Sequence, residues 1–412
     1  MTLARATWPT PADFAAPPTA VDLRHWDQAD RAARPARRAR VTARFAAAGI
    51  DAYFGVRREH MRYLTGFNLA DGEEKVAGAS GQFLLSGDEL VVFADSRYTI
   101  QARRESPEAR VEIVYGDLLS RWPELVASIG AKRLGVEAGF VPHATWTKLA
   151  EAAPDVELIP IEGWVEADRA TKEPAELERI AAACAVADRA LAGLLPDIHA
   201  GVTEAALAMQ LEWAMRTGGA EALSFDVACL AGPEAALPHG APGDRPVSDG
   251  AVLLFDFGAQ VAGYRSDMTR TLFVGEPTSR DADIYELVAR AQRAAIEALE
   301  AAVRSDDPLP SGRVFDAVAR DVISAAGHGD HFGHTLGHGI GLATHELPSL
   351  GQRAADAPLP SPTVFSVEPG VYLDGETGVR IEDLMSIDHA AHRIERLTHF
   401  PSEAVIVGDG AP

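Results

Sequence analysis

The sequence has very few cysteines and no long run of apolar residues. Only two cysteines occur among 412 residues, Cys184 and Cys229, which excludes a disulfide framework and favours two small buried side chains in a reducing compartment. No stretch approaches the roughly 20 apolar residues that a membrane-spanning helix needs. The N-terminal residues lack the apolar core of a signal peptide. We therefore expect a soluble, cytoplasmic protein.

Basic residues are scarce relative to acidic ones. The chain has 38 Lys and Arg against 60 Asp and Glu, which gives a formal net charge of −22. Nucleic acids and anionic membranes attract clustered Lys and Arg, so this excess of acid argues against both as partners. The remaining composition, 47% hydrophobic and 24% charged, is that of a globular chain long enough for two or three domains.

The pattern along the chain divides it into three segments. Residues 1–28 are rich in Pro and Ala without periodicity, and we expect a poorly packed leader. Residues 29–167 alternate short apolar runs with helical patterns, which predicts an α/β domain. Residues 168–412 combine paired strands with separate helices, which predicts an α+β domain with an antiparallel sheet. The basic run Arg31–Arg40 is interpreted as a solvated helix face rather than a binding patch.

Individual elements follow from the same patterns. Strands are predicted at 51–55, 82–85, 90–94, 111–114, 134–137 and 156–161. Helices are predicted at 118–129, 142–152, 175–195, from Thr203 onward, 280–303 and 311–326. The N-cap region of the helix at 175–195 is placed at Thr171 to Pro174.

Two aspartates stand in or beside apolar strands. Asp256 lies within AVLLFDFG, and Asp267 precedes the strand-like run MTRTLFV on the other arm of a predicted hairpin. An acid among apolar strand residues is costly unless it is paired or bound to a cation. The hairpin can bring both carboxylates to one face, and because two close carboxylates repel, a positive group should lie between them.

A second segment repeats this arrangement. Glu368 and Glu382 lie in apolar strand contexts on either side of Gly375, where the chain would reverse. One such pair alone could equally be surface acids or salt-bridge partners. Two hairpins with two acids each favour a shared site, and they indicate a duplicated half-domain with pseudo-two-fold symmetry.

A run of histidines lies between the two hairpins. It contains His328, His331, His334, His338 and His345, but it is neither a helical HExxH motif nor a glycine-rich phosphate loop. Four carboxylates with at least one imidazole suit Mn²⁺, Co²⁺, Fe²⁺ or Zn²⁺. A charge of −4 on the four carboxylates is balanced by two divalent ions, which together could activate a hydrolytic water.

At these residues the sequence resembles the pita-bread metallopeptidase family of methionine aminopeptidases, Xaa-Pro aminopeptidases, prolidases and creatinase. The resemblance is carried by FDFG, GYRSDMTRT, GHGIGLATHELP, SVEPGVYL and GVRIEDL, and it covers nearly the whole chain. It implies a C-terminal pita-bread domain after a creatinase-type N-terminal domain. It also implies five ligands for two metal ions, with Mn²⁺ as the expected ion: Asp256, Asp267, His338, Glu368 and Glu382.

The resemblance also implies roles for further residues. His345 would assist at the scissile carbonyl, Glu368 would pass the proton to the leaving nitrogen, and Arg380 would support an acidic ligand. His239 would line the substrate pocket and His334 would be a further active-site histidine, whereas His328 and His331 are expected to be structural. The long N-terminal region resembles the prolidase and aminopeptidase P branch, which cleaves the bond before a proline at the second position of a peptide.

One departure and two alternatives remain open. Several dipeptidases of this family carry an Arg after HExP to hold the free carboxylate of proline, but here Ser349 stands there and the nearest arginine is Arg353. This weakens a strict dipeptidase interpretation. The same scaffold could instead act on a non-peptide small molecule, as a creatinase or a lyase does, or serve as a non-catalytic binding protein. The resemblance further implies a homodimer.

Overall fold

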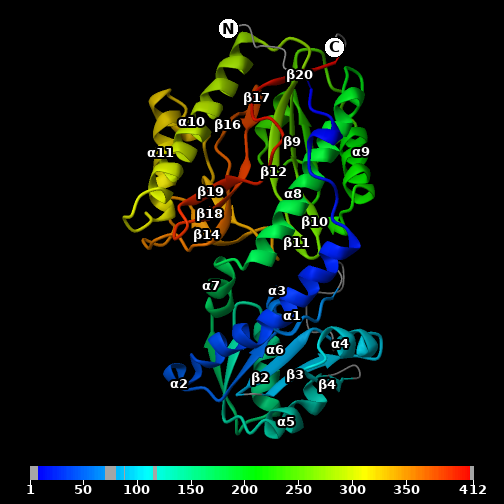
Figure 1. Cartoon of the computed structure of the whole chain (residues 1–412), viewed down its shortest axis with the longest axis vertical. Helices are drawn as coiled ribbons and strands as arrows, with labels where there is room; N and C mark the ends of the chain where they lie inside the picture. The colour runs from blue at the N-terminus through cyan, green and yellow to red at the C-terminus, as the bar shows by residue number, and fades with distance from the viewer. Residues whose placement is uncertain (1–7, 70–79, 88, 115–117, 409–412) are drawn as a thin grey trace. The chain divides into compact units, whose positions relative to one another are not determined.

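The computed structural model describes residues 8–69, 80–87, 89–114 and 118–408 (Figure 1). These residues form two compact units. The N-terminal unit is Arg24–Asp168, and the C-terminal unit runs from Arg169 onward and includes the described residues before Arg24.

The N-terminal unit is built on a six-stranded mixed sheet in the order β4-β3-β2-β1-β5-β6. Strand β1 pairs parallel with β5 and antiparallel with β2. The strands are β1 Ala52–Gly55, β2 Gln82–Ser86, β3 Glu89–Ala94, β4 Arg110–Ile113, β5 Arg133–Glu137 and β6 Glu157–Ile161. The helices are α1 Ala20–Thr42, α2 Phe45–Ala48, α3 Arg58–Thr65, α4 Thr99–Glu105, α5 Leu118–Ser128, α6 His143–Ala152 and α7 Trp164–Ala170.

The core of this unit lies between the sheet and helices α5 and α6. Phe54 of β1 contacts Trp122 of α5 edge to face, with ring centroids 4.9 Å apart. Val136 and Leu149 complete the same buried cluster. Strands with apolar residues on both faces, separated by helices, are typical of an α/β domain, as the alternating pattern predicts.

The basic run on α1 is not the solvated face that the sequence predicted. Arg34 and Arg37 are 3% and 1% exposed. Asp30, one turn before Arg34, receives hydrogen bonds from both guanidinium groups, at 3.1 Å from Arg34 Nη2 and 2.8 Å from Arg37 Nη1. Because an acid at this spacing satisfies both cations, they can be buried against the fold. The prediction was wrong for these two residues.

The expected leader also differs in its described part, since residues 1–7 lie outside the described chain. Trp8 donates its indole N–H to the carbonyl of Ile406 at 3.0 Å. The ring of Phe14 stacks on that of Phe400, with centroids 6.4 Å apart. These apolar contacts show that residues 8–19 pack along the C-terminal unit rather than loosely.

Helix α1 begins inside the same stretch, at Ala20. The Thr19 amide donates to the Asp22 carboxylate at 2.7 Å, and the Asp22 amide donates to the Thr19 hydroxyl at 3.4 Å. Such a reciprocal cap satisfies amides that have no partner within the helix. It sets the start of the helix within the predicted leader.

The C-terminal unit contains two larger antiparallel sheets, apart from a parallel pairing of β12 with β20, and two smaller ones. The larger sheets have the orders β20-β12-β9-β8 and β14-β13-β15-β18-β19, and the smaller ones are β11-β10-β7 and β16-β17. The strands are β7 Ala222–Leu223, β8 Ala228–Ala231, β9 Ala251–Phe257, β10 Ala259–Val261, β11 Tyr264–Arg265, β12 Met268–Val274, β13 Gly337–Gly339, β14 Glu346–Leu350, β15 Thr363–Val367, β16 Gly370–Leu373, β17 Thr377–Arg380, β18 Asp383–Asp388, β19 Arg393–Arg396 and β20 Val405–Val407.

Helices flank these sheets in two pairs: α10 Ser279–Val303 with α11 Gly312–Ala325, and α8 Pro174–Leu194 with α9 Glu204–Thr217 (Figure 1). Short 3₁₀ helices lie at Pro11–Asp13, Leu195–Asp197, Gly232–Ala236 and Gly329–His331. The N-cap of α8 is Glu173, within the predicted region, and its amide donates to the Glu176 carboxylate at 2.8 Å. The core of the unit is a buried cluster that joins α10 and α11 to the sheets.

Both acidic segments change sheets at their acids. Strand β15 pairs with β18 up to Val367 and Asp383, and β16 then pairs with β17 from Gly370 and Arg380. Glu368 and Glu382 therefore lie between two ladders, where Pro369 has no N–H to continue the first one. The first segment is likewise no simple hairpin, because β10 and β11 are inserted between β9 and β12.

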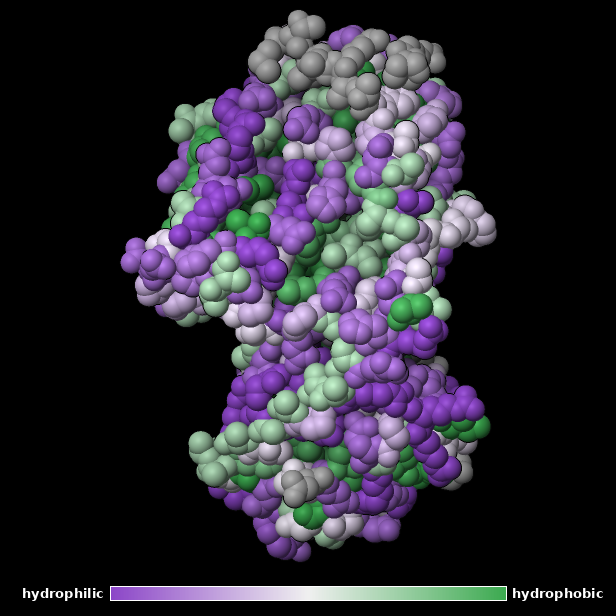
Figure 2. All heavy atoms as spheres, in the orientation of Figure 1, coloured by the Kyte–Doolittle hydropathy of each residue, from purple (hydrophilic) through white to green (hydrophobic). Residues whose placement is uncertain are grey.

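The face seen in Figure 2 is largely polar. Figure 2 shows hydrophilic side chains over most of the visible face of each unit, with apolar side chains in smaller groups between them. Both cysteines are buried and free, as their scarcity predicts. Among helices in the described ranges, none is long and apolar enough to cross a membrane.

Candidate metal centre

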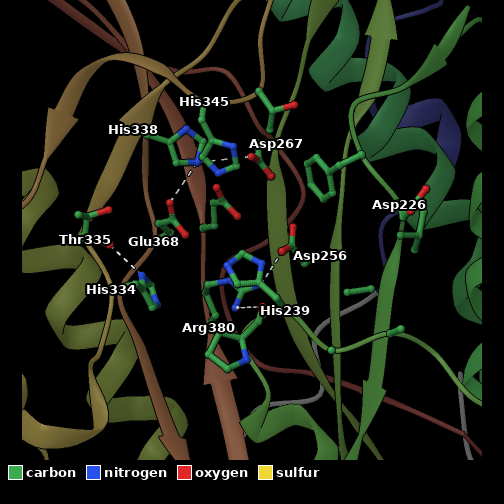
Figure 3. Close-up of a pocket in the computed structure, with 18 of the residues that line it drawn as sticks. Asp226, His239, Asp256, Asp267, His334, Thr335, His338, His345, Glu368 and Arg380 are labelled. Atoms are coloured by element: carbon green, nitrogen blue, oxygen red, sulfur yellow. Dashed lines mark hydrogen bonds and ion pairs between the residues drawn. The ribbon is translucent and has the colours of Figure 1, made fainter. Parts of the chain in front are cut away.

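The C-terminal unit encloses a cavity of about 510 Å³ between the two acidic segments (Figure 3). Every residue that the sequence predicts for the site lines this cavity. They are His239, Asp256, Asp267, His334, His338, His345, Glu368, Arg380 and Glu382. Residues separated by more than 140 positions thus meet in one place.

The acids of the site come from two halves of the C-terminal unit, the first with strands β9 to β12 and the second with strands β15 to β18. Asp256 is in β9 and Asp267 directly precedes β12, whereas Glu368 and Glu382 follow β15 and precede β18. Between the halves His338, on β13, brings its Nε2 to 3.4 Å from Glu368 Oε1 and 3.7 Å from Asp267 Oδ2. Figure 3 shows Asp256, Asp267, Glu368 and His338 pointing toward a common space.

Ligand atoms of Asp267, His338 and Glu382 lie within 4.8 Å of one another, which is close enough to share a cation. Two oxygens strengthen this interpretation: Asp256 Oδ1 and Glu382 Oε1 are buried without a hydrogen-bond partner. In each case the other oxygen of the same carboxylate is hydrogen-bonded, to Arg380 and to Thr269 respectively. A buried bare carboxylate oxygen is unfavourable unless a cation binds it, so the donor set fits a hard divalent metal.

Burial and mutual repulsion perturb the acids. Burial, and then repulsion from Glu382 and Asp256, raise the pKa of Asp267 well above its usual range. The pKa of Glu382 is also raised well above the usual range by burial and by Glu368 and Asp256. Burial raises the pKa of Glu368 more modestly, because His334 and Arg380 oppose the shift. A metal-free site would therefore hold protons that a cation displaces.

Arg380 connects the acids to a tyrosine that the sequence did not single out. Its guanidinium donates to Asp256 Oδ2 at 2.6 Å and to the Tyr372 hydroxyl at 2.8 Å. His334 Nε2 lies 2.8 Å from the same hydroxyl. Burial raises the pKa of Tyr372 to about 12, so its hydroxyl keeps its proton. Tyr372 stands in the motif SVEPGVYL, but only the fold shows that it reaches Arg380.

Of the remaining histidines, His345 lies at the cavity, whereas His328 and His331 do not line it. The rings of His345 and His338 have centroids 4.2 Å apart. Burial, and then the neighbouring His338 and His239, lower the pKa of His345 to about 4, so its imidazole is neutral near pH 7. His328 and His331 contact each other, Nδ1 to Nδ1 at 3.2 Å, and they are not among the residues that line the cavity.

Several lining residues were not predicted from the sequence. The cavity wall also includes Phe225, Asp226, Val227, Ala228, Pro238, Gly240, Ala241, Pro242, Thr335 and Thr344. Most are small or apolar. Thr344 stands in the motif GHGIGLATHELP, and the others lie outside the motifs that carry the resemblance. Ser349 and Arg353 are not among the lining residues, and Ser349 instead pairs with His338 across β13 and β14.

Comparisons with known proteins agree with this arrangement. A sequence model of metallopeptidase family M24 matches residues 178–389, and one of the creatinase/prolidase N-terminal domain matches residues 37–171. The uncharacterized peptidase YqhT of Bacillus subtilis is 35% identical over 363 residues, which are 88% of this chain and 98% of that protein.

Two solved structures resemble the whole fold. An Xaa-Pro dipeptidase from Bacillus anthracis is 33% identical with a TM-score of 0.81, over 91% of this chain and 100% of that one. An X-Pro aminopeptidase from Thermotoga maritima is 34% identical with a TM-score of 0.76, over 87% of this chain and 98% of that one.

Proposed function

The chain belongs to metallopeptidase family M24, and from this premise we propose that it hydrolyses the peptide bond between an N-terminal residue and a following proline. The observation that carries the proposal is the convergence of four acids and His338 on one cavity, with two carboxylate oxygens left bare. The names of the similar structures, an Xaa-Pro dipeptidase and an X-Pro aminopeptidase, support the choice of substrate.

The proposed cofactor is a pair of divalent ions, Mn²⁺ first and Co²⁺, Zn²⁺ or Fe²⁺ as alternatives. The proposed ligands are Asp256, Asp267, His338, Glu368 and Glu382. Two such ions neutralise four carboxylates, and when bound they polarise the scissile carbonyl and lower the pKa of a water so that it can attack near neutral pH.

Side chains of the protein would then transfer protons and stabilise the developing charge. Glu368, whose pKa is raised, is the base that takes the proton of the attacking water and delivers it to the proline nitrogen. Neutral His345 donates a hydrogen bond to the oxygen on which negative charge develops. Arg380 holds Asp256 in place, while His239 and His334 line the space for the peptide.

We extend the proposal to peptides longer than two residues. Among the described residues that line the cavity, Arg380 is the only Lys or Arg. Its guanidinium is 4% exposed and already bound to Asp256, Thr269 and Tyr372. Because no lining cation remains for the free carboxylate of a dipeptide, nothing in the described wall favours a dipeptide over a tripeptide.

A substrate panel tests the proposal on the full chain loaded with Mn²⁺. We expect release of alanine from Ala-Pro and from Ala-Pro-Ala, abolished by a chelator and restored by Mn²⁺. Ala-Ala-Ala is the matched control and should be cleaved at least tenfold more slowly. Turnover of creatine alone, or equal rates on the two tripeptides, would contradict the proposal.

The homodimer implied by the resemblance and the cytoplasmic location stay predictions. Light scattering on the full chain tests the first, and a monomer mass would contradict it.

A further inference from the structure

Thr269 occupies a central place in the site, although nothing in the sequence assigns it a role beyond its place in the motif GYRSDMTRT. It is the second residue of β12, lies opposite Asp256 in the β9–β12 ladder, and is completely buried. Its hydroxyl is 2.7 Å from Glu382 Oε2 and 2.8 Å from Arg380 Nε. One side chain therefore joins an acid of one half of the site to the arginine that holds the acid of the other half.

The direction of these hydrogen bonds is fixed by chemistry. A guanidinium can only donate, so Arg380 Nε–H donates to the Thr269 oxygen. The single hydroxyl hydrogen of Thr269 is then donated to Glu382 Oε2. Glu382 Oε2 is committed to this bond, and Oε1 is the buried oxygen that has no partner.

The backbone keeps the two residues together. The Glu382 amide donates to the Thr269 carbonyl at 3.1 Å. The neighbouring Arg270 donates to the carbonyl of Glu382 and, at 2.6 Å, to the Asp383 carboxylate. With the main chain held in this way, the Glu382 carboxylate can still turn about its side-chain torsions, and the last of these has only broad intrinsic preferences.

We propose that Thr269 is a positioning residue that fixes the rotation of the Glu382 carboxylate, so that Oε1 faces the metal while Oε2 is held through Thr269 and Arg380. The inference rests on the proposed metal-binding role of Glu382 and Asp256. Arg380 positions Asp256 in the same manner, through Oδ2, and leaves Oδ1 bare. Loss of a side chain that orients a metal ligand costs about 10–100-fold in metal affinity.

The experiment measures Mn²⁺ affinity of the full chain, without substrate, by calorimetric titration after chelation. Thr269→Val keeps the shape of the side chain and removes the hydroxyl, and we expect the affinity for one ion to fall about 10–100-fold. Thr269→Ser retains the hydroxyl and should bind within about threefold of wild type. Thr271→Val is the matched control, because Thr271 is on the same strand, 1% exposed, and bonded to the backbone carbonyl of Arg380 instead of to an acid.

Thr269→Ala against Thr269→Ser gives a second comparison if Thr269→Val does not fold, since these two variants differ by the hydroxyl alone. Circular dichroism of each metal-free variant confirms the fold before titration. Wild-type affinity in Thr269→Val or Thr269→Ala, or an equal loss in Thr271→Val, would overturn the role of Thr269 and leave the proposed function standing. Failure of the wild type to bind Mn²⁺ would overturn the proposed metal site itself.

Discussion

At the scale of single residues, the two oxygens of a carboxylate in the site have different roles. Asp256 and Glu382 each commit one oxygen to a hydrogen bond within the protein and keep the other buried and bare. Two bare oxygens, with the buried acids Asp267 and Glu368 close by, make the site unstable in its fully ionised form without a cation. This has a measurable consequence for the metal-free protein.

We predict that the stability of the metal-free protein decreases as pH rises. The pKa values of Asp267 and Glu382 are raised well above their usual range by burial and repulsion, so the folded state holds protons that the unfolded state has released. A raised carboxyl pKa contributes stability below the ordinary pKa of about 4, and this stability is lost as pH rises through the folded value. Thermal unfolding of chelated protein between about pH 7 and 8 measures this loss, because the lowered pKa values of His334, His338 and His345 have the opposite effect at lower pH.

Excess Mn²⁺ provides the control, because a bound cation replaces the protons and should flatten the pH dependence of the melting temperature. A melting temperature of the chelated protein that rises over this range would contradict the prediction.

Residue types and their order were sufficient to predict that the four acids share a site, because a buried acid is costly unless it is paired or bound to a cation. Which histidines join them was implied only by the resemblance to the family. The family and fold class predicted from the motifs are confirmed by the family matches and the structural neighbours. Thr269 and Tyr372 could not be predicted in this way. A threonine and a tyrosine within strands are ordinary core residues until the fold brings their hydroxyls to Arg380.

At the scale of elements, periodicity located helices well and strand pairing less well. Helix α8 was predicted at 175–195 and spans Pro174–Leu194, because its apolar face and its N-terminal proline are local signals. The two acidic segments were predicted as hairpins, and their arms do pair antiparallel, but neither stays in one sheet. Each in fact leaves one sheet at its acids and enters another, at Gly258 in the first segment and Pro369 in the second. Which sheet a strand joins depends on partners distant in the sequence.

A buried ion cluster anchors the strand that follows His345, and we predict that it is costly to disrupt. Glu346, the first residue of β14, pairs with Arg169 and with Lys172 Nζ at 2.9 Å, and all three side chains are at most 3% exposed. Burial would raise the pKa of Glu346, but the two cations outweigh it and the pKa is lowered. Glu346→Gln removes the carboxylate charge that both buried cations share, which should cost about 3–5 kcal/mol in urea unfolding.

Two variants calibrate this measurement. Lys172→Met retains the Arg169–Glu346 pair and should lose less stability than Glu346→Gln. Glu376→Gln removes an acid whose side chain is 62% exposed and should change the free energy of unfolding by no more than about 0.5 kcal/mol. If Glu346→Gln were as mild as Glu376→Gln, the cluster would not be an anchor.

At the scale of the whole molecule, the two units have separate buried cores, one on the N-terminal six-stranded sheet and one beneath α10 and α11. The proposed metal ligands all belong to the C-terminal unit. The net charge of −22 therefore has two origins: a few acids enclosed at the site, and many at the polar surface. Sequence patterns predicted two folded regions. Only the packing in the structure shows that residues 8–19 contact the C-terminal one.

We predict that Mn²⁺ stabilises the two units unequally, because a ligand stabilises only the part of the structure whose unfolding releases it. At a free concentration about 100 times the dissociation constant, binding adds about 2.7 kcal/mol, which slows exchange through unfolding about 100-fold. Hydrogen exchange by mass spectrometry should show this slowing in β9, β12, β15 and β17, and much less in β1 to β6. Chelated protein gives the baseline for each peptide. Equal slowing in both units would instead mean that they unfold as one cooperative structure despite their separate cores.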